Sequence, residues 1–229
     1  MEDKLLILIP AYNEAENIET VVENLIKNYP QYDYLVVNDG SKDDTLGICK
    51  RKGFHYMDLP INLGLECGFR AGMKYAYREG YDYLLQFDAD GQHLPEYIEP
   101  MYKKIKEGYD IVIGSRFVTE KKPWSSRMIG SRLIAGAIFL TTGRRIKDPT
   151  SGMRMYNKKC MAEFEKSYNL APEPDTVSYL IKCGAKVAEV QANMQERLAG
   201  KSYLNFTRSI SYMARMILSI LVIQNFRKR

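Results

Sequence analysis

The chain has 229 residues, of which 45% are hydrophobic, so it is long and apolar enough to bury a substantial core as one α/β domain. Its four cysteines are scattered without a CxxC pair and its only histidines are His55 and His93, which argues against a zinc site or a disulfide framework and fits reduced thiols in a cytosol. The first ten residues carry acids where a signal peptide carries bases, so we expect a first strand there rather than a leader.

The net charge of +5 is unevenly divided along the sequence. Residues 197–229 include seven basic residues and no acidic ones, whereas the other 196 residues hold 26 bases and 28 acids. A basic tail suits an anionic partner such as phosphate, nucleic acid or a membrane face. The seven bases are Arg197, Lys201, Arg208, Arg215, Arg227, Lys228 and Arg229.

Strand-like apolar runs alternate with helix-like patterns through the first half of the chain. This alternation predicts a mostly parallel sheet with helices on both faces, in which ligands bind outside the carboxyl ends of the strands. The expected strands are residues 4–9, 34–37, 54–59, 83–87 and 110–113, and the expected helices are residues 14–27, 43–52, 65–78 and 95–106.

The second half of the chain is less regular. It predicts helices at 125–141 and 176–183 and short strands at 152–156 and 186–189. No composition shift marks a linker, so we expect one catalytic domain over residues 1–203 followed by a basic amphipathic helix over residues 204–229.

Three polar clusters directly follow predicted strands: PAYNE at 10–14, NDGSKDDT at 38–45 and DADGQH at 88–93. Because the carboxyl ends of parallel strands meet at one edge of a sheet, we expect the clusters to lie together. Taken singly, NDGS is equally typical of a turn and a helix N-cap, and Asn13 of a cap. Three acidic clusters at one edge favour a binding site.

Asp88 and Asp90 lie two residues apart, so in an extended segment both carboxylates point the same way while Ala89 faces elsewhere. Two like charges this close are destabilising unless something neutralises them. Mg²⁺ or Mn²⁺ suits such a pair, because these ions commonly bind one or two carboxylates together with substrate phosphates. Gln92 adds a carbonyl oxygen on the same side. His93 is either a further ligand or packs near the next helix start.

Seven short motifs follow one another in a familiar order. The chain resembles the family 2 glycosyltransferases with the GT-A (Rossmann-like) fold, and among them it is most similar to the dolichyl- or polyprenyl-phosphate sugar synthase branch. The motifs are PAYNE, VNDGSKDDT, NLG at 62–64, DADGQH, GSR at 114–116, DPTSGMR at 148–154 and ERLAGKS at 196–202.

The resemblance implies a role for each matching residue. Nucleotide-sugar contacts fall to Pro10, Tyr12, Glu14, Val37, Asp39 and Ala89. The metal that bridges the diphosphate falls to Asp88, Asp90 and Gln92, and phosphate contacts fall to Arg116, Arg197 and Lys201. Preplaced cations stabilise the charge that develops on a diphosphate leaving group. For Arg116 and Arg154 the alternative is a structural salt bridge with neighbouring acids.

An inverting transfer commonly uses a carboxylate to take the acceptor's proton. Glu173 and Asp175 lie where many relatives have such a base. The alternative is a helix start, with Pro174 at the first position and acids favourable to the helix dipole. An acceptor that is already an ionised phosphate needs no strong base.

These features together predict an inverting, metal-dependent glycosyltransferase. Its donor is a nucleotide sugar, UDP- or GDP-linked, and its acceptor is either a polyprenyl phosphate or a sugar on a growing lipid-linked polysaccharide. A sugar-1-phosphate nucleotidyltransferase is the first alternative, but it requires a Gly-rich, Arg-containing loop after the first strand, and PAYNE is not one. A non-catalytic nucleotide-sugar-binding partner is the second. The sequence does not identify the base, the sugar or the acceptor.

The C-terminal segment carries a helical apolar stripe. Seven of the eight residues from 216 to 223 are apolar, yet the run is shorter than the roughly 20 residues that span a bilayer. We expect peripheral attachment to the cytoplasmic membrane face, alone or with a membrane-protein partner or a second copy, and no binding of nucleic acid. The alternative is a helix that docks on the catalytic domain or self-associates. The stripe consists of Phe206, Ile210, Met213, Ile217 and Ile220.

Overall fold

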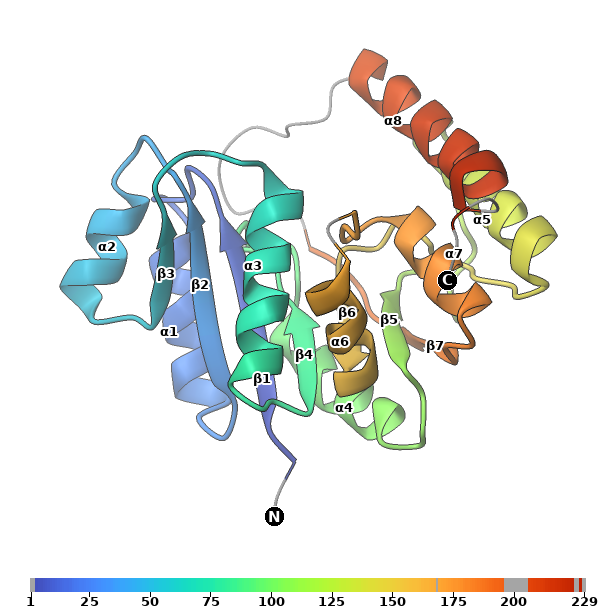
Figure 1. The fold of residues 1–229 in the computed structure, drawn as a ribbon. Helices are drawn as coiled ribbons and strands as arrows, with labels where there is room; N and C mark the ends of the chain where they lie inside the picture. The colour runs from blue at the N-terminus through green and yellow to red at the C-terminus, as the bar shows by residue number, and fades with distance from the viewer. Residues whose placement is uncertain (1–2, 168, 196–205, 225–226, 228–229) are drawn as a thin grey trace.

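The computed structural model describes residues 3–167, 169–195, 206–224 and 227. A single seven-stranded sheet runs through the molecule in the order β3-β2-β1-β4-β6-β5-β7 (Figure 1). Only β6 runs antiparallel to its neighbours, so the predicted mostly parallel sheet is confirmed. The strands are β1 Leu5–Ala11, β2 Asp33–Asp39, β3 Tyr56–Leu59, β4 Tyr83–Gln86, β5 Ile111–Ser115, β6 Arg154–Asn157 and β7 Val187–Gln191.

Strand residues alternate between two cores, as the two-residue period of a strand requires. On one face Leu6 and Leu8 belong to a core that includes residues of α3, α5, α6 and α7, and on the other Ile7 and Ile9 belong to a core that includes residues of α1, α2 and α4. The predicted helices on both faces are therefore present. The helices are α1 Ile18–Asn28, α2 Thr45–Lys52, α3 Leu65–Arg78, α4 Ile98–Ile105 after a 3₁₀ turn at Pro95–Tyr97, α5 Ser126–Thr142, α6 Lys158–Lys166, α7 Pro174–Lys182 and α8 Phe206–Leu218.

α3 approaches the sheet closely at Gly72. A Cβ added there would lie 2.2 Å from Leu8 Cδ1, so only a residue without a side chain allows α3 to approach β1 this closely. The backbone of α3 thereby sits directly over β1.

The C-terminal helix belongs to the same fold. α8 continues into a π-helical turn at Ser219–Ile223, and Figure 1 shows it beside α5 and above α7. Met216 and Ile220 are buried in the core that α5 and α7 share, with Met213 and Ile217 packed against it. Only part of the predicted apolar stripe therefore packs on the domain, because Ile210 remains about half exposed. Among the described helices, none is both long and apolar enough to span a membrane.

Candidate active site

The clusters that follow β1 and β2 are joined by hydrogen bonds at the carboxyl edge of the sheet. Asn13, with φ of 55°, accepts a hydrogen bond from the amide of Lys42 at 2.8 Å and donates its own amide to Ser41 Oγ at 3.0 Å. The amide of Glu14 donates to Thr45 Oγ1 at 2.9 Å. These bonds occupy residues 13–17, so α1 begins at Ile18 rather than at residue 14 as predicted.

Asp39, at the end of β2, is buried and held by the NLG loop. Its two carboxylate oxygens accept the amides of Leu63 and Gly64, each at 2.8 Å. Gly40 next to it has φ of 61°, and a Cβ there would lie 2.5 Å from the Asn62 backbone nitrogen, so this turn requires glycine. The loop at 62–64 therefore fixes the orientation of the Asp39 carboxylate.

The other residues assigned to the nucleotide sugar differ in exposure. Tyr12 is exposed, and Pro10 and Glu14 are half-buried. Val37 and Ala89 are fully buried. Arg197 and Lys201, together with the whole ERLAGKS motif, lie outside the described residues.

The DADGQH turn follows β4 and is organised around His93. The buried His93 ring accepts the amide of Asp88 at Nδ1, 2.9 Å away, which places its proton on Nε2, 3.6 Å from Asp88 Oδ2. Asp90 is buried and its Oδ1 accepts the amide of Gln92 at 3.0 Å. His93 therefore packs behind Asp88 and orients it.

Asp88 is the carboxylate of this turn that reaches solvent, with 35% of its side chain exposed. A Cβ on Gly152 would lie only 3.0 Å from Asp88 Oδ2, so glycine keeps the space beside that oxygen open. Within the described ranges, no cluster of three or more histidine, cysteine or acidic side chains is arranged to hold a metal by itself. The donor set fits an ion whose coordination is completed by substrate phosphates and water.

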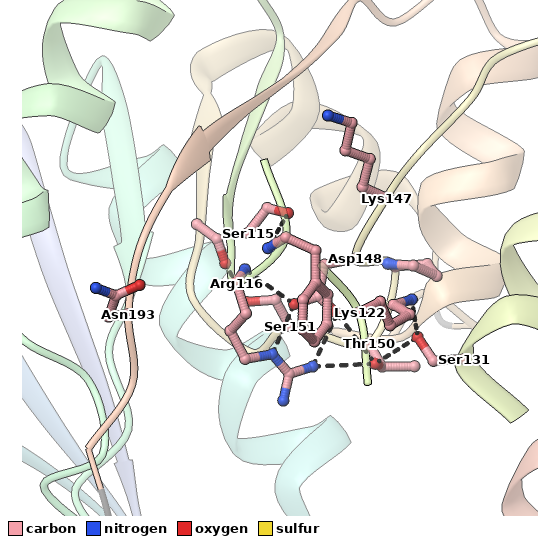
Figure 2. A network of polar contacts seen from close by, with 12 residues as sticks. Ser115, Arg116, Lys122, Ser131, Lys147, Asp148, Thr150, Ser151 and Asn193 are labelled. Carbon is pink, nitrogen blue, oxygen red and sulfur yellow. Dashed lines mark hydrogen bonds and ion pairs between the residues drawn. The ribbon is translucent and has the colours of Figure 1, made fainter. Parts of the chain in front are cut away.

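Arg116, which follows β5, forms an ion pair with a buried acid. Its Nε and Nη2 donate to the two oxygens of Asp148 at 2.7 and 2.8 Å, and Nη2 also donates to Thr150 Oγ1 at 3.3 Å (Figure 2). Burial opposes ionisation of Asp148, yet Arg116 holds the pKa of Asp148 below its ordinary value. The salt bridge considered for Arg116 is thus present, and 21% of the Arg116 side chain remains exposed.

A second cation joins this network. Lys122 Nζ donates to Ser131 Oγ at 2.8 Å, and Ser131 lies 3.2 Å from Thr150 Oγ1 (Figure 2). Burial lowers the pKa of Lys122, and the nearby charge of Arg116 adds to that shift while Asp148 opposes it. The cluster thus contains two cations, Arg116 and Lys122, near one buried acid and two hydroxyl groups. Arg116 forms an ion pair with that acid, and Lys122 is close enough to be affected by its charge. The sequence analysis missed Lys122, Ser131 and Thr150, since no fixed spacing links them.

Arg154 of β6 is held by backbone carbonyls and not by the salt bridge considered for it. It is buried, and its Nε and Nη2 donate to the backbone carbonyls of Ser151 and Pro149, both at 2.8 Å. In the described part of the chain it makes no ion pair, and its Nη1 has no hydrogen-bond partner. Gln86, directly opposite on β4, has an equally unpartnered Oε1.

Glu173 and Asp175 begin α7, with Pro174 at its first position, so the helix-start geometry is present. Both carboxylates also contact the C-terminal helix. Tyr212 donates to Glu173 Oε2, and Ser219 Oγ donates to Asp175 Oδ2 at 2.6 Å. Whether either residue serves as a base stays a prediction.

The family model described as "Glycosyl transferase family 2" matches residues 6–164, which contain all the clusters above except α7 and the C-terminal helix. The chain belongs to this family. It is a glycosyltransferase, as the sequence motifs predicted.

Two relatives and one solved structure extend this finding. The chain is 31% identical over 216 residues to the polyprenol monophosphomannose synthase of Mycolicibacterium smegmatis, covering 88% of this chain and 81% of that protein. It is 32% identical over 183 residues to the UDP-N-acetylglucosamine–dolichyl-phosphate N-acetylglucosaminyltransferase of Methanococcus voltae, covering 70% of this chain and 72% of the relative. Glucosyl-3-phosphoglycerate synthase from Mycobacterium tuberculosis, solved with Mn²⁺ and UDP-glucose, has the same fold at a TM-score of 0.68 and 15% identity, over 99% of this chain and 80% of that one.

Proposed function

We propose that the protein transfers a sugar from a nucleotide sugar to the phosphate of a polyprenyl-type lipid, with inversion at the anomeric carbon. The observation that carries this proposal is the pairing of two cations with two hydroxyls beside the sheet edge. Arg116 and Lys122 with Ser131 and Thr150 are donors of the kind that bind a phosphate group. The names of the two relatives agree with a lipid-phosphate acceptor.

One loop connects this cationic cluster to the DADGQH turn. At one end Asp148 pairs with Arg116, and at the other Gly152 lies against Asp88. Ser151 between them donates to the carbonyl of Gly114 at 2.5 Å. A phosphate on the cluster and a diphosphate at Asp88 would therefore lie on two sides of the same short loop, which is the arrangement that transfer between them requires.

The proposed reaction breaks the bond between the sugar's anomeric carbon and the donor diphosphate. An oxygen of the lipid phosphate attacks that carbon from the opposite face, so the products are a glycosyl lipid phosphate and a nucleoside diphosphate. Asp88, Asp90 and Gln92 would hold Mg²⁺ or Mn²⁺, which neutralises charge on the departing diphosphate when bound. His93 keeps Asp88 in position, and Asp39 with the NLG loop would orient the nucleoside.

The acceptor oxygen is already ionised in this scheme, so no strong general base is needed. Arg116 and Lys122 bind and orient it, and the hydroxyl groups of Ser131 and Thr150 add hydrogen bonds. The growing-polysaccharide acceptor considered from the sequence presents a hydroxyl instead and would require Glu173 or Asp175 to accept a proton.

The protein would meet such a lipid at the cytoplasmic face of a membrane, reached in part through the C-terminal helix. Deleting the C-terminal helix would not test this attachment cleanly, because the deletion would also remove Met216 and Ile220 from the core. Substitutions of exposed residues avoid that damage. A membrane-protein partner or a second copy of the chain remains part of this proposal, and neither is needed for the chemistry.

The test is a transfer assay with UDP- and GDP-linked sugars, each with Mn²⁺ or Mg²⁺. Two acceptors are compared in detergent: a polyprenyl phosphate and the corresponding polyprenol. We expect product only on the phosphate. Equal transfer to the alcohol, or transfer to neither acceptor with any donor, would contradict the proposed function.

A further inference from the structure

α5 carries an apolar stripe that the protein leaves exposed. Ile129, Leu133 and Leu140 lie along one side of the helix, and 79% of Leu140 is accessible to solvent. Trp124 lies just before the helix and is 82% exposed. The opposite side of α5, with Ile134 and Ile138, is buried in the core. α5 therefore carries apolar residues both on its buried side and on its solvent-exposed side.

α8 and the following π-turn carry a second exposed apolar stripe beside the first. α5 and α8 meet at Gly130, where an added Cβ would lie 1.4 Å from Met213 Sδ, so the helices are in direct contact (Figure 1). Leu133 lies three residues from Gly130 and Ile210 three residues from Met213, so each stripe adjoins the contact. The exposed apolar residues of this second stripe are Ile210, Leu218, Leu221, Val222 and Ile223.

Both helices come from parts of the sequence without acids. Residues 121–147 contain seven bases and no acid, as do residues 197–229, so these two segments hold 14 of the 33 bases. The rest of the chain then has 19 bases against 28 acids. α5 and α8 belong to these two segments and lie in direct contact, so the described cations Arg132 and Arg215 fall in one part of the molecule.

One cation of α5 and one that follows the helix lie against exposed aromatic rings. The guanidinium of Arg132 lies 4.3 Å from the ring centre of Trp124, and that of Arg145 lies 5.2 Å from the ring centre of Phe139. Aromatic rings bordered by basic side chains are typical of surfaces that sit at the boundary between lipid headgroups and acyl chains.

We propose that α5 and the residues from 121 before it form, together with α8 and its π-turn, one surface that binds an anionic lipid bilayer. The proposal rests on the proposed function, because it explains how a lipid phosphate reaches the site. A second copy of the chain fits this surface poorly, since two acid-free surfaces would face each other. An anionic bilayer satisfies the apolar stripes and the surrounding cations at the same time.

This surface adjoins the cationic cluster. Lys122 and Ser131, which bind each other in that cluster, come from the same segment as Trp124 and Leu133. An acceptor phosphate held by Lys122 would thus lie at headgroup level while its lipid chain stays in the bilayer. α5, rather than the C-terminal helix alone, sets this alignment.

Trp124 is the only tryptophan of the chain, which allows a direct test on the full-length protein. Its emission is recorded with phosphatidylglycerol vesicles and with phosphatidylcholine vesicles, and binding is measured by flotation. We expect a blue shift, and quenching by brominated acyl chains, on the anionic vesicles. Flotation without any change in Trp124 emission, or no flotation, would overturn the proposal.

Matched variants assign the contribution of each helix. Leu133→Asn combined with Leu140→Asn should lower vesicle affinity at least tenfold, and so should Leu218→Asn combined with Leu221→Asn. Ile26→Asn, at an exposed apolar position of α1 on the other face of the sheet, should leave binding unchanged. Loss of binding in the α8 variant with none in the α5 variant would overturn the role of α5.

Transfer to a polyprenyl phosphate in detergent separates this inference from the proposed function. The α5 variant should retain that activity, because Leu133 and Leu140 lie outside the cluster. Insertion of Trp124 in a protein without transferase activity would refute the function and leave the surface standing. Transfer by a protein that ignores vesicles would refute the surface alone.

Discussion

Tyr212 of α8 donates a hydrogen bond to the carboxylate of Glu173, 39 positions earlier in the chain. Burial raises the pKa of Glu173 above its ordinary 4.5, and the charges of Asp175 and Glu66 add to the shift. The Tyr212 hydrogen bond and the charge of Arg154 oppose it. A residue from the C-terminal helix therefore helps to set the ionisation of a carboxylate at the candidate site.

Replacing Tyr212 by Phe should raise the pKa of Glu173 further and destabilise the protein by about 1–3 kcal/mol, because a half-buried carboxylate loses a hydrogen bond. Urea unfolding at several pH values measures both effects. Tyr77→Phe on α3 is the control, since its hydroxyl has no hydrogen bond in the described part of the chain. Equal stability of the two variants would show that the Tyr212 contact contributes little.

The raised pKa of Glu173 also predicts the pH dependence of stability. A group with a raised native pKa favours the folded state fully below its unfolded value of 4.5, and this contribution is lost as the pH rises through the native value. Glu173→Gln removes the titration, so the wild type should lose stability relative to this variant as the pH rises from 4.5 through the raised native pKa. A difference that does not change with pH would contradict the shift.

Glu173→Gln also distinguishes the two kinds of acceptor. With a lipid phosphate as acceptor, turnover should stay within a few-fold of wild type, because no proton has to be removed. A strong loss of kcat with unchanged donor affinity would instead indicate a hydroxyl acceptor and a catalytic base. The assay uses saturating donor and measures kcat and KM separately.

Asp90→Asn keeps the size of the side chain and removes its charge. Transfer should fall by orders of magnitude, since the ion that neutralises the leaving diphosphate would bind weakly. The thermal unfolding midpoint should change little, and EDTA should inactivate the wild type to a similar extent. Transfer that survives both treatments would exclude the metal role.

Lys122→Met should raise KM for the lipid phosphate by about tenfold, as expected for one lost charge-assisted hydrogen bond. KM for the nucleotide sugar should be nearly unchanged. Lys27→Met, at an exposed position of α1 on the other face of the sheet, is the control. An effect on the donor KM instead would assign the cluster to the donor diphosphate.

The sheet was predictable because strands and helices differ in the period of their apolar residues. The direction of β6 was not, since a short strand such as 152–156 reads the same in either direction and only its pairing with β4 and β5 fixes it. α6 was missed, and its buried residues Cys160, Met161 and Phe164 are too few to stand out among its lysines and glutamates.

The candidate site was likewise only partly predictable from the sequence. Asp39, Asp88 and Asp90 could be placed from the sequence, because each follows a strand and so must lie at one edge. The cluster around Arg116 could not, since Lys122, Ser131 and Thr150 meet only when α5 packs beside the loop at 148–154. The acid-free run at 121–147 is the sequence signal that points to this cluster.

The uneven distribution of charge has a consequence before any contact forms. Because α5 and α8, from the two acid-free segments, lie in contact while the rest of the sequence has more acids than bases, the described part of the molecule has an electric dipole. Near an anionic bilayer this dipole experiences a torque that turns α5 and α8 towards the lipid while the acidic remainder is repelled. The field extends only about 8 Å at physiological ionic strength, so reorientation occurs in the last stage of approach and weakens as salt is added. Collisions would then be productive from almost any starting orientation.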